Sequence, residues 1–156
     1  MLTVSIPAHI QQTLHSALKN AGTAECGGVL MGEHVGPDLF AVRALTVQGG
    51  GSFASFVRNA RAALQALTAF FHRSNDDFAR FNYLGEWHSH PSFSVNPSEV
   101  DHRSMLDIVT NPVVRANFVV LLIFRLGAKG DLEGSAHTYL PNGSIWPSTL
   151  VFETLS

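Results

Sequence analysis

The chain has 156 residues, enough to bury about 70% of its unfolded surface around one core, and we expect a single domain over residues 1–156. Its ten Lys and Arg residues are scattered among twelve Asp and Glu, so the formal charge of −2 gives no basic field and argues against nucleic acid as a partner. The single cysteine cannot form an internal disulfide, and the absence of a long apolar run predicts no membrane span. Because there is also no basic leader, we expect a cytoplasmic location.

The first half of the chain predicts alternating strands and helices. Residues 2–6 alternate as a strand does, and residues 7–22 carry apolar side chains four apart before a glycine, as a helix does. Residues 27–48 predict two strands that break at a Gly-Pro pair, with a flexible glycine-rich connection near residue 50. Residues 57–72 are rich in alanine and leucine and predict a second helix.

A strand, a loop and a third helix follow in the middle of the chain. The strand is expected over residues 81–90 and an irregular loop over residues 91–97. Ser98 is placed to act as the N-cap of a helix that runs to about Thr110, where an Asn-Pro pair stops it.

The last part of the chain predicts further strands. Residues 116–126 are apolar on both faces, which is typical of a central strand, and residues 135–140 form the next one. Residues 148–155 are expected to be extended or helical. This order of elements predicts an α/β domain with a central mixed sheet flanked by helices.

Two histidines one residue apart, with an aspartate eleven residues later, form the most informative pattern. Strand side chains alternate, so His88 and His90 face the same way with Cα atoms about 6.6 Å apart, and two imidazoles can then converge on one zinc ion. Asp101, in the first turn of the third helix, would look back at them, whereas Trp87 would face the core and His102 elsewhere. Three protein ligands leave one position for water, as catalytic zinc requires.

Other polar residues near this pattern have more than one interpretation. As an N-cap, Ser98 uses its oxygen as an acceptor, which leaves its hydroxyl proton free to stabilise an oxyanion. Glu86 shares the face of His88, and spacing alone leaves open a role as general base or as a partner that orients a histidine. Five histidines have no partner at ligand spacing and are expected in the core or on the surface: His9, His15, His34, His72 and His137.

Three stretches of sequence, two of which overlap, resemble a known family. The stretch HSHPSFSVNPSEVD resembles the H-[ST]-H, seven residues, S-x-x-D signature of the JAMM (MPN+) zinc metallopeptidases at every defined position. The stretch ECGGVLMG resembles the E-x-G-G-x-L-x-G form of bacterial JAB-domain members, and YLGEWHSHP is similar to a bacterial subgroup encoded beside ubiquitin-like conjugation genes, including antiphage operons. The H-E-x-x-H pattern of many metalloproteases and the P-C-x-x-C half of zinc deaminases are absent.

The resemblance implies an MPN/JAB-like fold, related to that of cytidine deaminases, and one zinc ion per chain. The implied activity is that of an isopeptidase or peptidase that cleaves after the C-terminal tail of a ubiquitin-like protein, in deconjugation or in precursor processing. It assigns His88, His90 and Asp101 to the zinc ion and Glu25 to activation of a zinc-bound water, with Ser98 beside them. A non-catalytic MPN-type scaffold, as in family members that have lost the metal ligands, stays open as an alternative.

The resemblance also implies partners. The substrate would be a ubiquitin-like protein or its conjugate, with E1-like and E2-like enzymes of the same operon as further partners. Gly27 and Gly28 would permit close backbone packing or substrate approach, an extended tail would lie against a strand edge, and the loop around Phe93 would shape the cleft. The same chemistry on a sulfur-carrier precursor or on a small-molecule amide stays open as an alternative.

Overall fold

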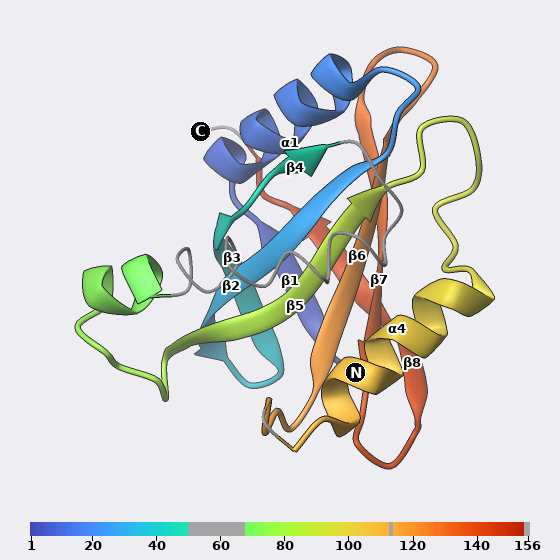
Figure 1. Cartoon of the computed structure of the whole chain (residues 1–156). Helices are drawn as coiled ribbons and strands as arrows, with labels where there is room; N and C mark the ends of the chain where they lie inside the picture. Colours follow the sequence, from blue (N-terminus) through green and yellow to red (C-terminus); the bar gives the residue numbers. More distant parts are fainter. Residues whose placement is uncertain (50–67, 113, 155–156) are drawn as a thin grey trace.

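The structure, a computed structural model, describes residues 1–49, 68–112 and 114–154 (Figure 1). In chain order, the elements are β1 (Thr3–Ile6), α1 (Ala8–Ala21), β2 (Cys26–Gly36), β3 (Leu39–Leu45), β4 (Gln48–Gly49), β5 (Phe81–Ser89), α4 (Glu99–Thr110), β6 (Val119–Leu126), β7 (Leu132–Tyr139) and β8 (Ile145–Phe152). Within the described ranges, no helix is both long enough and apolar enough to cross a bilayer.

Most of the predicted elements are confirmed. The two strands predicted over residues 27–48 break where expected, at a turn in which Asp38 has a φ of 53°. The final segment, predicted as extended or helical, is a strand. The connection predicted near residue 50 and most of the helix predicted over residues 57–72 lie outside the described residues, although residues 68–73 are helical. The short strand β4 was not predicted from the sequence.

The strands form a mixed sheet, as predicted, and their order in the sheet is β3-β1-β8-β7-β6-β5-β2-β4. β3 pairs with β2 as well as with β1, so seven of the strands close into a ring, and β4 is added beside β2. The pairs β1–β3, β1–β8 and β5–β6 are parallel, and the remaining pairs are antiparallel.

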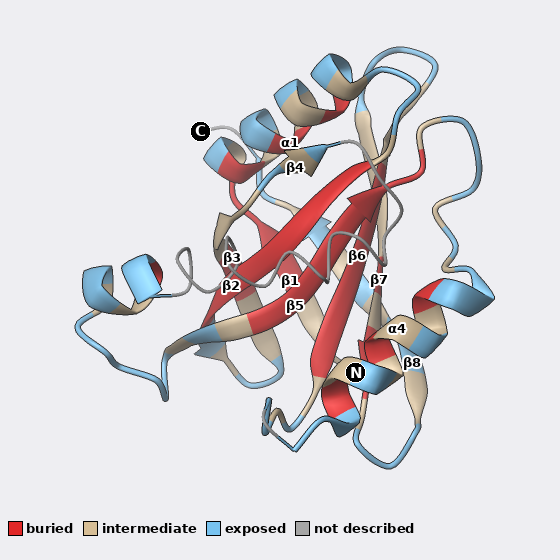
Figure 2. Cartoon of the chain, in the orientation of Figure 1, coloured by how far each residue is buried: buried red, intermediate tan, exposed pale blue. Residues whose placement is uncertain are grey.

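The central strand β6 is buried on both faces, as its apolar sequence predicted (Figure 2). Alternate side chains of the strand enter two different clusters, because neighbouring side chains point to opposite faces. One cluster includes α1 and the other includes α4, so the two helices cover different faces of the sheet. The first cluster contains Val120, Leu122 and Phe124 with Ile10, Leu14 and Leu18, and the second contains Val119, Leu121 and Ile123 with Met105 and Val109.

Two glycines allow backbones to approach each other around β5. Gly85 follows a register shift in the pairing with β2, has a φ of 153°, and lies where a Cβ atom would overlap the carbonyl oxygen of Val120 on β6. A Cβ atom at Gly28 would overlap the carbonyl oxygen of Thr46, so the close packing expected at this glycine is confirmed. The close approach of β5 to β6 and of β2 to Thr46 therefore requires glycine at positions 85 and 28.

We expect Gly85→Ala to lower the free energy of unfolding by about 2–4 kcal/mol, because the methyl group must displace the β6 backbone and the φ is unfavourable for alanine. Urea unfolding followed by circular dichroism measures the change. Gly36→Ala is the matched control, since its Cβ would meet only the Leu39 side chain at ordinary distances of 3.7–3.8 Å. Equal stability losses in the two variants would contradict the close-packing argument.

Candidate metal centre

Strand pairing and one helix start bring four polar side chains together. β2 and β5 are antiparallel, with Gly27 opposite His88. Glu25 lies two residues before Gly27 and so reaches the same face, while His90 directly follows β5. Asp101 comes from the first turn of α4, which covers this face of the sheet.

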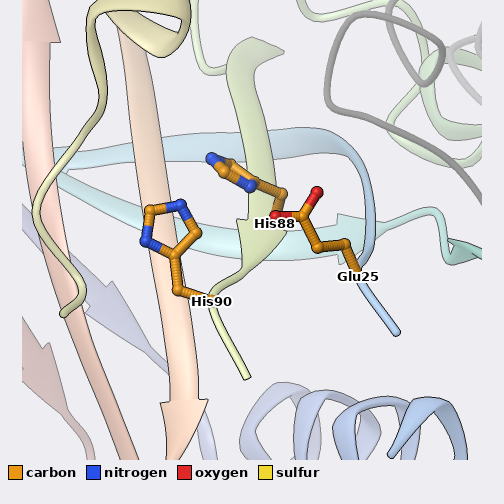
Figure 3. A group of neighbouring side chains, drawn as sticks. All are labelled: Glu25, His88 and His90. Carbon is orange, nitrogen blue, oxygen red and sulfur yellow. The ribbon is translucent and has the colours of Figure 1, made fainter. Parts of the chain in front are cut away.

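The side chains of these residues converge. The Nε2 atom of His88 lies 3.2 Å from Oδ1 of Asp101, and Nε2 of His90 lies 3.6 Å from Oδ2 of the same carboxylate. One ligand atom from each of Glu25, His88 and His90 lies within 4.8 Å of the others (Figure 3). Both histidines and Asp101 are buried, whereas Glu25 is half-buried. The structure thus gathers all four residues that the sequence analysis singled out for metal binding and proton transfer.

A capping box fixes the Asp101 carboxylate. The Ser98 hydroxyl oxygen accepts a hydrogen bond from the Asp101 backbone N–H at 3.1 Å, and Oδ2 of Asp101 accepts one from the Ser98 N–H at 2.8 Å. The predicted N-cap role of Ser98 is therefore confirmed. Burial acts to raise the pKa of Asp101, but the nearby His88 and His90 rings and the hydrogen bond from the Ser98 N–H hold it far below its ordinary range.

The loop after β5 determines which nitrogen of His90 carries a proton. Nδ1 of His90 lies 2.6 Å from the carbonyl oxygen of Ser94, and this oxygen can only accept a hydrogen bond. Nδ1 therefore carries the hydrogen, and in the neutral ring Nε2 presents a lone pair to the cluster. The Phe93 ring stacks on His90 with centroids 4.2 Å apart, so the loop borders the cluster as expected.

Glu86 shares the face of His88 but has a different hydrogen-bond partner. Its carboxylate accepts a hydrogen bond from the Tyr83 hydroxyl at 2.6 Å. Burial raises the pKa of Glu86 to about 8, although the Tyr83 hydrogen bond opposes this shift. A carboxyl group that is largely protonated at neutral pH is a poor general base. The raised pKa of Glu86 therefore favours Glu25 for that role. Orientation of a histidine by Glu86 stays a prediction.

Residues adjacent to the cluster point away from it, as predicted. Trp87 is fully buried on the α1 side, and its Nε1–H donates to the Thr46 carbonyl. His102 turns to Tyr139, with Nδ1 2.8 Å from the hydroxyl oxygen. Cys26 also lies on the far side, with Sγ 3.6 Å from the Ser89 hydroxyl. The donors that face the cluster are thus imidazole nitrogens and carboxylate oxygens, a set that suits zinc.

The sequence analysis missed several contacts around the cluster. Tyr83 was not connected with Glu86, because strict alternation places two residues that are three apart on opposite faces. The irregular pairing near Gly85 brings them to the same face. The Ser94 carbonyl was not predicted as a partner of His90, because a backbone atom in an irregular loop leaves no pattern in side-chain spacing.

Comparison with known proteins gives three findings. Residues 7–135 match the family described as prokaryotic homologs of the JAB domain, a range that includes all four clustered residues. A protein named CD-NTase/cGAS isopeptidase, from Enterobacter hormaechei subsp. hoffmannii (strain UCI 50), is 35% identical over 147 residues, or 88% of this chain and 71% of that one. The solution structure of protein DSY2949 from Desulfitobacterium hafniense is similar in fold, with a TM-score of 0.64 at 18% identity over 97% of this chain and 94% of that one.

The ion pair between His90 and Asp101 predicts a pH-dependent stability in metal-free protein. Burial lowers the pKa of His90, but Asp101 and the Ser94 carbonyl raise it above its ordinary 6.5, so its stabilising contribution is full below 6.5 and is lost as the pH rises through the folded value. The pKa of Asp101 lies below its ordinary 3.8, so its contribution is present above 3.8 and is lost as the pH falls toward the folded value. We therefore expect Asp101→Asn to lower the free energy of unfolding most between about pH 4 and pH 6.5.

Urea unfolding in the presence of a chelator, at about pH 3, 5.5 and 8.5, measures this penalty across the window. Asparagine keeps an acceptor for the Ser98 N–H, so the change removes charge while preserving the capping box. Ser98→Ala, which removes an uncharged cap, should show a loss of stability that does not vary with pH. An Asp101→Asn penalty of constant size at all three pH values would contradict the assignment.

Proposed function

The chain belongs to the family of prokaryotic JAB-domain homologues, and we propose that it is a zinc-dependent hydrolase that cleaves the isopeptide or peptide bond after the C-terminal tail of a ubiquitin-like protein. The observation that carries the proposal is the convergence of two imidazole nitrogens and one fixed carboxylate, with a second carboxylate beside them. The name of the similar Enterobacter protein, an isopeptidase, supports the type of bond.

The two carboxylates differ in ways that support different roles. Asp101 is buried and held by the capping box, so its position suits a permanent metal ligand together with His88 and His90. Glu25 directly precedes β2 and is half-buried, so its carboxylate has access to solvent and to a substrate. We therefore assign the first three residues to zinc and Glu25 to proton transfer.

The proposed reaction relies on these residues for proton movement. When bound, zinc supplies Lewis-acid polarisation of the scissile carbonyl and lowers the pKa of water to about 7. Glu25 accepts a proton from the attacking water and passes it to the leaving lysine nitrogen, whose conjugate acid has a pKa of about 10.4 and which must leave protonated. The Ser98 oxygen is used by the helix cap, and its hydroxyl proton is available to a developing oxyanion.

The sheet also supports a place for an extended substrate tail. Among the residues that the structure describes, β4 is the terminal strand of the sheet order, and it pairs with Cys26 and Gly27, directly after Glu25 in the chain. A terminal strand offers backbone N–H and C=O groups to a further strand, and such pairing binds a tail with little demand on its sequence. The proposed tail would therefore lie along β4, with its scissile bond near Glu25.

The name of the Enterobacter relative also supports a class of modified protein. That protein is named CD-NTase/cGAS isopeptidase, and it is 35% identical to this chain. From this name we propose that the conjugated target is a protein of the CD-NTase/cGAS class, in an antiphage conjugation pathway. Cleavage would then release the enzyme from its ubiquitin-like modifier.

We expect purified protein to contain one zinc ion per chain and Glu25→Gln to keep that zinc while losing activity by about 100-fold or more, because proton transfer by a placed side chain contributes about that much. Inductively coupled plasma mass spectrometry measures the zinc content. Cleavage of a ubiquitin-like protein joined to lysine measures the activity, with short amides as comparison substrates. His88→Ala is the control, since it should lose zinc and activity together.

Three outcomes would contradict the proposed function. Full activity in zinc-loaded Glu25→Gln protein would exclude Glu25 as the group that transfers the proton. Preference for short amides over every ubiquitin-like fusion would favour a small-molecule hydrolase. Protein that binds no zinc would instead support a scaffold.

Ser98 allows the capping role and the oxyanion role to be separated. Alanine at an N-cap costs about 1 kcal/mol of stability, whereas glycine costs only a few tenths. We expect Ser98→Ala and Ser98→Gly to differ in melting temperature but to lose similar activity, about 10-fold or more, since both remove the hydroxyl. Thermal unfolding and steady-state kinetics on the same preparations measure the two effects. Activity that follows stability, with Ser98→Gly close to the parent, would show that the hydroxyl acts only as a cap.

A further inference from the structure

Arg125, near the end of β6, reaches the loop that follows His90. Its Nη1 atom donates to the Phe93 carbonyl at 3.1 Å, and its Nε atom donates to Oε2 of Glu133 on β7 at 2.7 Å. The side chains of Arg125 and Glu133 are 38% and 39% exposed. An exposed ion pair of this kind contributes about 1 kcal/mol or less to folding. Its main effect is therefore geometric, because it holds the guanidinium in one orientation against the loop.

The loop is attached at three successive residues. Arg125 holds the carbonyl of Phe93, and the Ser135 hydroxyl donates to the carbonyl of Val95 at 2.5 Å. Between these two attachments, the Ser94 carbonyl accepts the Nδ1–H of His90 at 2.6 Å. The Phe93 ring stacks on the same imidazole with an interplanar angle of 27°. The sheet thus fixes the loop on both sides of the one carbonyl that contacts His90.

The hydrogen bond to the Ser94 carbonyl determines whether Nε2 of His90 carries a lone pair or a hydrogen toward the cluster. With Nδ1–H bound to this carbonyl, a neutral imidazole must direct the lone pair of Nε2 toward Asp101 and Glu25. If the loop moved, the ring could take the other tautomer and present an N–H group, which cannot bind a cation. The His90 backbone N–H donates to the Phe124 carbonyl on β6 at 2.9 Å, which holds the backbone in place but does not set the tautomer of the imidazole ring.

We propose that Arg125, oriented by Glu133, is a positioning residue that fixes the tautomer and ring orientation of His90 through the loop. The consequence for zinc rests on the proposed function, whereas the effect on the His90 ring does not. Loss of partners that orient a metal-binding histidine typically costs about 10- to 100-fold in metal affinity. Since Arg125 acts one contact further away, we expect Arg125→Ala to weaken zinc binding by about 5- to 10-fold.

The charge change makes this test specific. Removing a positive side chain near a cation site strengthens cation binding through space, so an electrostatic effect of Arg125→Ala would raise zinc affinity. A fall in affinity therefore reports the positional effect. Arg103→Ala is the matched control, because it removes an exposed arginine on α4 that lies outside the loop.

The experiment combines three measurements on the full chain. Competition with a chromophoric chelator measures zinc affinity, long-range ¹H–¹⁵N NMR of metal-free protein at about pH 8.5 measures the His90 tautomer, and thermal unfolding checks the fold. We expect Arg125→Ala to lose the single Nδ1–H tautomer of His90 along with zinc affinity, and Arg125→Lys to recover part of both, since its ammonium can still donate to the Phe93 carbonyl. Glu133→Ala should add nothing in the Arg125→Ala background, because Glu133 acts through Arg125.

Unchanged zinc affinity and an unchanged His90 tautomer in Arg125→Ala protein would overturn the positioning role. So would an equal loss of affinity in Arg103→Ala protein, because the effect would then not depend on the loop. If the parent chain binds no zinc, the proposed function fails, and the NMR measurement alone decides for or against the effect of Arg125 on His90.

Discussion

The antiparallel pairing of β2 with β5 is the constraint on which the candidate centre depends. It sets Gly27 opposite His88, so the carboxylate two residues before Gly27 and the histidine two residues after His88 reach the same face. A shift of one residue in this register would send the side chains of one strand to the opposite face. Two glycines maintain the surrounding backbone, Gly85 against β6 and Gly28 against Thr46. The backbone pairing of β2 with β5 thus brings Glu25 close to His88 and His90, although they are far apart in the sequence.

The sequence predicted those parts of the fold and centre that follow from local periodicity and capping. The strand with His88, the helix that begins after Ser98 and the place of Asp101 in its first turn all follow from patterns within about 15 residues. The position of Glu25 beside the histidines was predicted from the family resemblance alone, because spacing carries no information across the 62 residues between Glu25 and His88. The closed ring of strands and the short β4 depend on long-range pairing, which local patterns do not encode.

Irregular backbone accounts for the contacts that sequence reasoning missed. The register shift before Gly85 brings Tyr83 to the face of Glu86, against simple alternation, and the hydroxyl then binds the buried carboxylate. The loop after His90 likewise acts through carbonyl oxygens, which every residue possesses and no sequence pattern marks. Side chains that carry chemistry can be found from their spacing, whereas the groups that orient them depend on where the backbone departs from regular geometry.

The two oxygens of Asp101 serve different purposes, which links the stability of α4 to the chemistry of the centre. Oδ2 accepts the Ser98 N–H at 2.8 Å and is the oxygen nearer to His90, at 3.6 Å. Oδ1 faces His88 at 3.2 Å. The helix cap therefore uses one oxygen, and the other is directed at His88, where the proposed zinc ion would bind. A glutamate at this position could complete a capping box, but its extra methylene would move the carboxylate relative to both imidazoles. The shorter side chain satisfies both demands because the cap and the cluster lie on the same side of the first helical turn.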